Sequence, residues 1–272
     1  MQFKDIAGQS ELKSTLIQTV KEQRVSHAQL FLGREGSGNL AMAIAYAQYI
    51  SCGNKTGNDS CGTCPSCIKY NKLIHPDLHF AVPIAKRKDE EKSVITENIL
   101  GEWREAVLEN PYLNLFQWME ALQVENKQLI INARECDEII KKLSFKPFES
   151  EYKVMIVWMP EKLFHAAAPK LLKILEEPSP KTLFILVAEN YEMILPTILS
   201  RTQLVKFPKI KDEDISAGLM EKFHLQPAQA SAISHLVDGN YNEAIHLAKE
   251  AKDESFNHKN FLPWMRLARR LP

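Results

Sequence analysis

A glycine-rich loop between an apolar strand and an apolar helix constrains the fold of this chain most strongly. Residues 33–41 read GREGSGNLA, and Gly33 and Gly38 have the spacing of a phosphate-binding loop, G-x-x-x-x-G-K-[ST]. Residues 28–33, AQLFLG, are typical of a buried strand, and residues 39–51, NLAMAIAYAQYIS, are typical of a buried helix. Phosphate-binding loops occur in this strand–turn–helix context, so we expect an α/β domain.

The loop lacks the two side chains on which nucleotide chemistry depends. Asn39 occupies the lysine position, and Leu40 occupies the Ser/Thr position that binds Mg²⁺. The glycines Gly33, Gly36 and Gly38 would keep the turn, and the free N–H groups that begin the helix could still attract an anion. We therefore expect weak nucleotide binding or none, and no ATP hydrolysis.

Strands and helices alternate along much of the chain, which predicts a parallel sheet covered by helices on both faces. After Pro208 the pattern is entirely helical, which indicates a second, smaller helical unit. The expected strands are 28–33, 152–159, 182–188 and 203–207, and the expected helices are 9–23, 39–51, 133–143, 166–178, 212–223, 227–237 and 241–251.

The segment 83–127 interrupts this alternation. It contains a charged run at 86–92, a helix-like stretch around Trp103 and an aromatic cluster at 111–120. Single strands of nucleic acid bind where basic and aromatic residues are interleaved, and this cluster contains no basic residue. We therefore interpret the segment as an insertion whose aromatic residues form local core.

Four cysteines fall within sixteen residues: Cys52, Cys61, Cys64 and Cys67. Their spacing, C-x8-C-x2-C-x2-C, is typical of a tetrahedral zinc site, although disulfides or free thiols are alternatives. A reducing compartment favours zinc over disulfides. A set of four cysteines leaves no open position on the metal, which predicts a structural role, and nearby His75 is not needed as a ligand.

The composition argues against a protein that binds nucleic acid by itself. The 272 residues include 34 Lys plus Arg and 34 Asp plus Glu, so the formal net charge is zero. Neutralisation of phosphates usually requires a basic excess. No run approaches the roughly 18 apolar residues of a membrane span, and the N-terminus MQFKDIAGQSELKS contains no apolar leader region. We expect a cytoplasmic protein that meets DNA only within a larger assembly.

Four segments follow one another in chain order: HAQLFLGREGSGN, the four-cysteine insertion, HPDL and, the most specific, LLKILEEPSPKTLFILVAENYEMILPTILSRTQ. Together they resemble the clamp-loader subunits of bacterial DNA polymerase III, an AAA+ family, and among them the delta prime subunits. The resemblance implies an AAA+ α/β domain over 1–208, with a zinc module at about 52–67 and a family-atypical insertion at about 83–127, a helical lid over 209–252, and the start of a truncated helical collar over 253–272.

The resemblance also implies that catalytic residues have been lost. Trp158 and Met159 stand where a motor subunit carries the Asp-Glu pair that binds Mg²⁺ and activates water. Asn242 lies about where a sensor arginine would face the γ-phosphate. Together with Asn39, these changes predict a chain that does not hydrolyse ATP.

One catalytic charge of the family is kept. Arg201, in LSRT, resembles the arginine of the family's Ser-Arg-Cys motif, which reaches the ATP site of the neighbouring subunit, although Thr202 replaces the usual cysteine. The alternative is a solvated arginine before a strand. Ser200 is expected to hold the turn. Glu176 and Glu177 are adjacent on an expected helix and point about 100° apart, so we do not expect them to act as an acid–base pair.

The resemblance thus implies a catalytically silent stator within the DNA-directed DNA polymerase holoenzyme. Its implied partners are gamma/tau and delta subunits in a hetero-pentamer, with the sliding clamp and primed DNA reached through the complex, and no membrane. Two alternatives remain open: an active AAA+ ATPase like gamma/tau, and a zinc-stabilised nucleic-acid-binding module. The basic tail RLARR is either a contact for DNA or a partner, or simply a solvated face.

Overall fold

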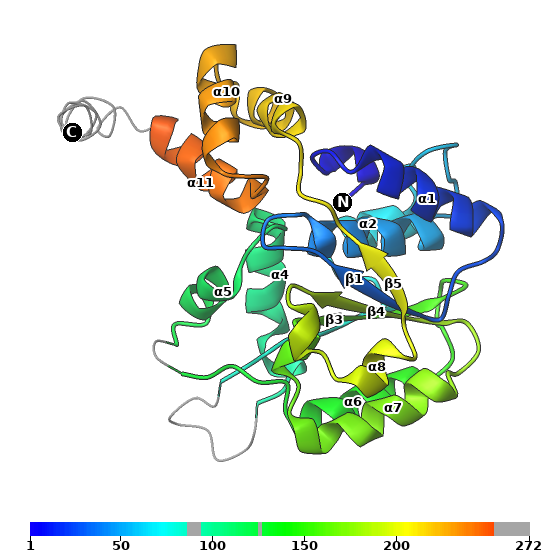
Figure 1. Ribbon diagram of the computed structural model, residues 1–272. Coiled ribbons are helices and arrows are strands. Elements are labelled where there is room, and N and C mark those ends of the chain that lie inside the picture. The colour runs from blue at the N-terminus through cyan, green and yellow to red at the C-terminus, as the bar shows by residue number, and fades with distance from the viewer. Residues whose placement is uncertain (86–93, 125–126, 253–272) are drawn as a thin grey trace.

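The structure is a computed structural model that describes residues 1–85, 94–124 and 127–252 (Figure 1). The charged run at 86–92 lies outside the described residues, and so does the expected start of a collar at 253–272. Within the described residues, no helix is both long enough and apolar enough to cross a membrane.

A five-stranded parallel sheet forms the centre of the molecule, in the order β2-β3-β4-β1-β5. The parallel α/β sheet predicted from the sequence is therefore confirmed. The strand β2, at one edge of the sheet, was not predicted. The strands are β1 (Ala28–Leu32), β2 (Leu78–Ala81), β3 (Lys153–Trp158), β4 (Thr182–Ala188) and β5 (Gln203–Lys206).

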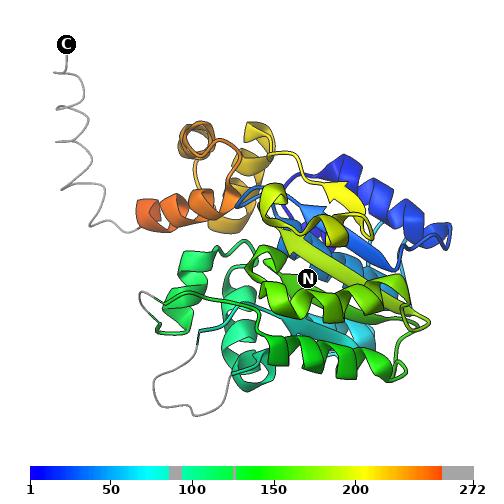
Figure 2. The ribbon, with the colours of Figure 1, turned by 60° about the horizontal axis from the view of Figure 1, so that its bottom comes forward.

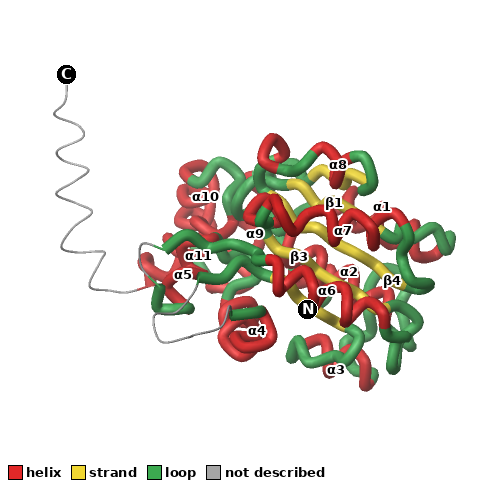
Figure 3. Tube along the Cα trace, turned by 90° about the horizontal axis from the view of Figure 1, so that it is seen from below, coloured by secondary structure: helices red, strands yellow, loops and turns green. Residues whose placement is uncertain are grey.

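Helices cover both faces of the sheet (Figures 1 and 3). On one face α2 (Asn39–Ser51) packs against β1, β3 and β4, and α1 (Ser10–Lys21) packs on α2. Twelve consecutive residues of α2, from Asn39 to Ile50, are buried, which explains why its sequence is apolar on every side. On the other face α6 (Ala133–Ser144) and α7 (Ala168–Glu176) lie side by side.

The segment predicted as an insertion forms helices α4 (Leu100–Glu109) and α5 (Leu115–Ala121). The ring of Trp103 lies 5.1 Å from that of Trp118 and 5.2 Å from that of Trp158 at the end of β3, measured between centroids. All three indoles are buried, so the aromatic residues here extend the core, as predicted. Phe116 is an exception, with 66% of its surface exposed.

Three helices that pack on one another follow the last strand: α9 (Asp212–Phe223), α10 (Pro227–Leu236) and α11 (Tyr241–Lys252) (Figure 2). The segment 189–201, predicted as a loop, contains the four-residue helix α8 (Pro196–Leu199). The short 3-10 helices are η1 (Phe3–Asp5), η2 (Thr96–Ile99), η3 (Pro160–Lys162), η4 (His165–Ala167) and η5 (Tyr191–Met193).

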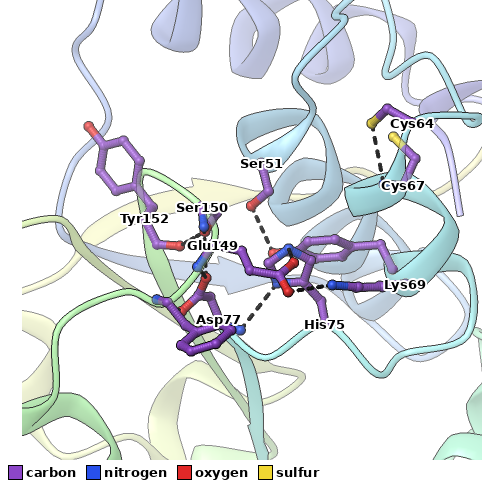
Figure 4. A network of polar contacts seen from close by, with 11 residues as sticks. Ser51, Cys64, Cys67, Lys69, His75, Asp77, Glu149, Ser150 and Tyr152 are labelled. Atoms are coloured by element: carbon purple, nitrogen blue, oxygen red, sulfur yellow. Dashed lines mark hydrogen bonds and ion pairs between the residues drawn. The ribbon is translucent and has the colours of Figure 1, made fainter.

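A buried polar network fixes the cysteine-rich segment to the sheet (Figure 4). The Asp77 carboxylate accepts hydrogen bonds from the backbone N–H groups of residues 148, 149 and 150, which lie between α6 and β3. The Nδ1 atom of His75 accepts from the Asp77 N–H at 3.1 Å, and its ring lies against Tyr70 of α3 (Pro65–Asn71). The HPDL segment is therefore an anchor between the edge strand β2 and the cysteine-rich segment.

Candidate functional site

The phosphate loop joins the carboxyl end of β1 to the first turn of α2. Gly36 and Gly38 have φ angles of +72° and +82°, in the left-handed region that favours glycine. A Cβ atom on Gly36 would stand 1.9 Å from Oδ1 of Asn240. Residues far along the chain therefore press directly against the loop.

The side chain of Asn39 fills the position where a lysine would reach a phosphate. Its amide nitrogen donates to the carbonyl oxygen of Ala188 at 3.1 Å and to that of Gly33 at 3.4 Å. Asn39 is 8% exposed, and Leu40 is 2% exposed within the core. The asparagine thus ties the loop to β4, and neither side chain offers a group to a nucleotide.

The first turn of α11 closes over the same loop. The backbone N–H of Tyr241 donates to the Gly36 carbonyl at 3.1 Å, and the Asn240 amide donates to the Glu35 carboxylate at 3.3 Å. Glu35 also accepts from Asn114 at 2.9 Å. These bonds join the loop, the α4–α5 segment and the C-terminal helices.

Asn242, the residue at the expected sensor position, turns away from the loop. It is 4% exposed, and its Oδ1 atom accepts from the side-chain amide of Asn110, at the end of α4, at 2.6 Å. Its neighbours Asn240 and Tyr241 make the contacts with the phosphate loop instead.

At the end of β3, Trp158 and Met159 occupy the positions where the resemblance places the Asp-Glu pair of a motor subunit. Trp158 points into the core, where it packs on Trp103, and Met159 is 3% exposed with a φ angle of +56°. Neither side chain can bind Mg²⁺ or orient a water.

Carboxylates that sequence reasoning missed lie close to the loop. Burial, followed by the nearby charges of Glu161 and Glu35, raises the pKa of Glu189 to about 7. Burial also raises the pKa of Glu161, whose Oε1 atom accepts from the Glu189 N–H at 3.1 Å. Acidic side chains that already resist ionisation beside one another also disfavour the added negative charge of a polyphosphate. A signal was available, because both residues follow the carboxyl ends of strands, where parallel sheets build their sites.

The four predicted cysteine ligands come together in one cluster. Sulfur–sulfur distances are 3.6 Å for Cys52–Cys61, 4.0 Å for Cys52–Cys64 and 3.9 Å for Cys61–Cys67, and all four sulfurs lie within 4.8 Å of one another. Zn–S bonds of about 2.3 Å place tetrahedral sulfurs about 3.8 Å apart. The cluster therefore fits a metal ion such as zinc. His75 is not part of it.

The cysteine-rich segment also holds the N-terminus. The Asp59 carboxylate accepts from the backbone N–H groups of Phe3 and Lys4 at 3.1 and 3.0 Å. The side chain of Gln2 donates to the carbonyl of Ser60. A metal that orders this segment would therefore also order the N-terminal turn against α2, since Phe3 packs on Tyr49.

Arg201 lies at the surface, at the amino end of β5. Its Nε atom donates to Oε1 of Glu176 at 2.7 Å, and its Nη1 atom donates to the Thr197 carbonyl at 2.9 Å and to Oγ of Ser200 at 3.0 Å. Ser200 in turn donates to the Thr197 carbonyl at 3.1 Å, so it helps to hold the turn. The Arg201 side chain is 32% exposed.

The parallel sheet, the loop after β1 and the C-terminal helices make up an AAA+-like fold. A variant of RuvB from Thermotoga maritima shares this fold, with a TM-score of 0.53 and 12% identity over 91% of this chain and 62% of that one. The family described as DNA polymerase III, delta subunit, matches residues 8–211, and the chain belongs to that family.

Named relatives agree with the resemblance noted in the sequence. The chain is 25% identical over 241 residues to DNA polymerase III subunit delta' of Bacillus subtilis, covering 89% of this chain and 59% of that protein. It is 24% identical over 254 residues to subunit tau of the same organism, covering 92% of this chain and 37% of tau. The chain therefore spans 59% or less of the length of these two relatives.

We expect the cysteine cluster to bind one zinc ion per chain. Cys61→Ser should abolish stoichiometric zinc and lower the melting temperature, because the segment loses the bond that orders it. Cys136→Ala, which changes a cysteine outside the cluster, should keep the zinc. Elemental analysis with thermal unfolding measures both effects. Full zinc content in the Cys61 variant would refute the site.

We expect Glu189→Gln to stabilise the protein above neutral pH. The folded-state pKa of Glu189 is raised from 4.5 to about 7, so its contribution to stability is lost as the pH rises between these values. The substitution should raise the free energy of unfolding by about 2 kcal/mol at pH 8 and by much less at pH 5.

Urea unfolding at the two pH values tests this expectation. Glu192→Gln makes the same change on an exposed residue nearby and should alter neither value. An equal effect of Glu189→Gln at pH 5 and pH 8 would contradict the assignment of the raised pKa.

Proposed function

We propose that this chain is a delta prime-type stator subunit of a DNA polymerase III clamp loader, one that does not hydrolyse ATP itself. Membership of the polymerase III family supports the setting. The main observation in favour of the proposal is that the chain's own residues fill the phosphate loop. Asn39 bonds to Ala188 and Gly33, and Tyr241 bonds to Gly36, so the chain's own groups satisfy the loop from within.

The position of Arg201 supports a role in a neighbouring subunit's ATP site. In the parallel pair β1–β5, Gln29 lies opposite Gln203 and Leu32 lies opposite Lys206. The phosphate loop follows Leu32, whereas Arg201 precedes Gln203, so the two lie at opposite ends of the sheet. Four residues of strand separate them by about 13 Å. Arg201 therefore cannot serve its own loop, and we infer that it acts in trans.

A guanidinium that acts in trans stabilises the charge that develops on the transferred phosphoryl group. The side chain is partly exposed, and Arg201 lies two residues after α8, which Ile198 anchors in the core. In this account the neighbouring ATPase, a gamma or tau subunit, supplies the Mg²⁺ ligands and the activated water. This chain supplies one positive charge, that of Arg201, from a position that the core of the domain holds fixed.

Zinc in the cysteine cluster would be structural, because four sulfur ligands leave no position for a reacting water. We further propose that residues 1–208 form the AAA+ domain and residues 209–252 its lid, held shut on the loop by Asn240 and Tyr241. The proposed partners are gamma/tau and delta subunits in a hetero-pentamer, and through them the sliding clamp and primed DNA.

In a loader reconstituted with ATPase subunits, we expect Arg201→Ala to lower ATP turnover with assembly unchanged. Arginine fingers contribute roughly 10³–10⁵ in rate at their own site. Total ATP turnover should therefore fall by about the fraction that the one ATP site facing this chain contributes to it. Arg24→Ala removes the same charge from an exposed side chain and serves as the control. Unchanged turnover with Arg201→Ala in an intact complex would refute the trans role.

A further inference from the structure

We propose that Glu176 is a positioning residue for Arg201: it fixes the direction of the guanidinium that the neighbouring ATP site receives. This inference rests on the proposed trans role of Arg201. Glu176 is the last residue of α7, and Arg201 follows α8, so the contact joins two elements that are separated by the whole of β4.

The contacts of Arg201 leave its guanidinium little freedom. Oε1 of Glu176 accepts from Nε at 2.7 Å, and Nη2 lies against the same oxygen. Nη1 is held by the Thr197 carbonyl and the Ser200 hydroxyl. Within the described part of the chain, these contacts engage four of the five N–H groups of the guanidinium and leave one, on Nη2. With 32% of its surface exposed, the Arg201 side chain is partly open to an incoming anion.

Holding the guanidinium in place favours catalysis in trans. A free arginine has many rotamers and loses most of them when it engages a phosphate, which weakens its effect on the barrier. Ordering the side chain before the partner arrives removes that loss, since catalytic groups work best when they are already oriented. The carboxylate holds one edge of the planar fork, and α8 holds the other.

The ion pair is poorly placed to serve stability alone. The C-terminus of a helix carries partial negative charge, so a carboxylate on the last residue of α7 is unfavourable there. The Glu176 side chain is 49% exposed, and exposed ion pairs contribute little to folding. The contribution to folding stability is therefore too small to explain the position of Glu176, whereas the orientation of Arg201 does explain it.

The adjacent residue supplies a matched control. Glu177 carries the same charge, is also exposed and follows Glu176 directly. It lies just beyond the last residue of α7, where the backbone leaves the helix. Among the described residues no contact between Glu177 and Arg201 is found. Glu176→Gln and Glu177→Gln therefore remove equal charge from neighbouring positions, and only the first removes the ionic contact with Arg201.

The test is a double-mutant cycle in the reconstituted loader, with steady-state ATP hydrolysis as the readout. We expect Glu176→Gln to lower kcat at the site facing Arg201 by about tenfold, because small misplacements of a catalytic group have effects of this order or larger. KM for ATP should stay the same. To measure that site alone, the loader is reconstituted with the other ATPase sites inactivated. In the Arg201→Ala background, Glu176→Gln should cause no further loss.

The outcomes separate the two proposals. If Arg201→Ala lowers kcat but Glu176→Gln leaves it unchanged or raises it, the positioning role is wrong and the trans role of Arg201 stands. A further loss from Glu176→Gln on top of Arg201→Ala would also overturn the positioning role, because the glutamate would then act elsewhere. If Arg201→Ala itself has no effect, the proposed function fails. Glu177→Gln should match the unsubstituted loader, and a tenfold loss there would show a general charge effect and refute the assignment to Glu176.

Discussion

The carbonyl oxygen of Ala188, at the carboxyl end of β4, holds the phosphate loop to the sheet. It accepts from the backbone N–H of Gly33 and from the side chain of Asn39, both at 3.1 Å. Asn39 also begins α2, so the same bonds fix the start of the most deeply buried helix. The turn keeps its shape through the chain's own hydrogen bonds, and it needs no nucleotide to do so.

The neighbouring helices depend on this closed loop. Tyr241 and Asn240 reach it from α11, and Asn114 reaches it through Glu35 from the α4–α5 segment. A loop that opened to admit a triphosphate would have to release these bonds and bring the phosphates near the carboxylates Glu161 and Glu189. A fixed subunit suits a stator, whose proposed task is to hold Arg201 still while its neighbours cycle.

Local sequence patterns predicted most of the fold, because the patterns themselves are strong. The apolar run of β4 and the alanine-rich run of α2 were placed at the bounds that the structure has. The strand β2 (LHFA) was missed because its four residues include no β-branched side chain, whereas β5, an edge strand of the same length, contains Val205. The helix α8, near the end of the predicted loop 189–201, was missed because four residues are too few to show a helical period.

The site was predictable only where it is local in sequence. The cysteine cluster and the altered loop follow from spacing within a few residues. The contact of Arg201 with Glu176, 25 residues away, and that of Asn242 with Asn110, 132 residues away, depend on how distant elements pack. A single sequence does not show which distant residues pair in space. From the sequence, Glu176 could be considered only together with its neighbour Glu177.

Calorimetric titration of the purified chain with ATP and Mg²⁺, alongside phosphate release, shows whether the chain's own residues fill and close the phosphate loop. We predict weak binding or none, and no turnover. We also predict no turnover for the double variant Asn39→Lys, Leu40→Thr, because Trp158 and Met159 supply no carboxylate. Tight binding with steady hydrolysis by the unaltered chain would mean that the loop is open and that this chain is a motor.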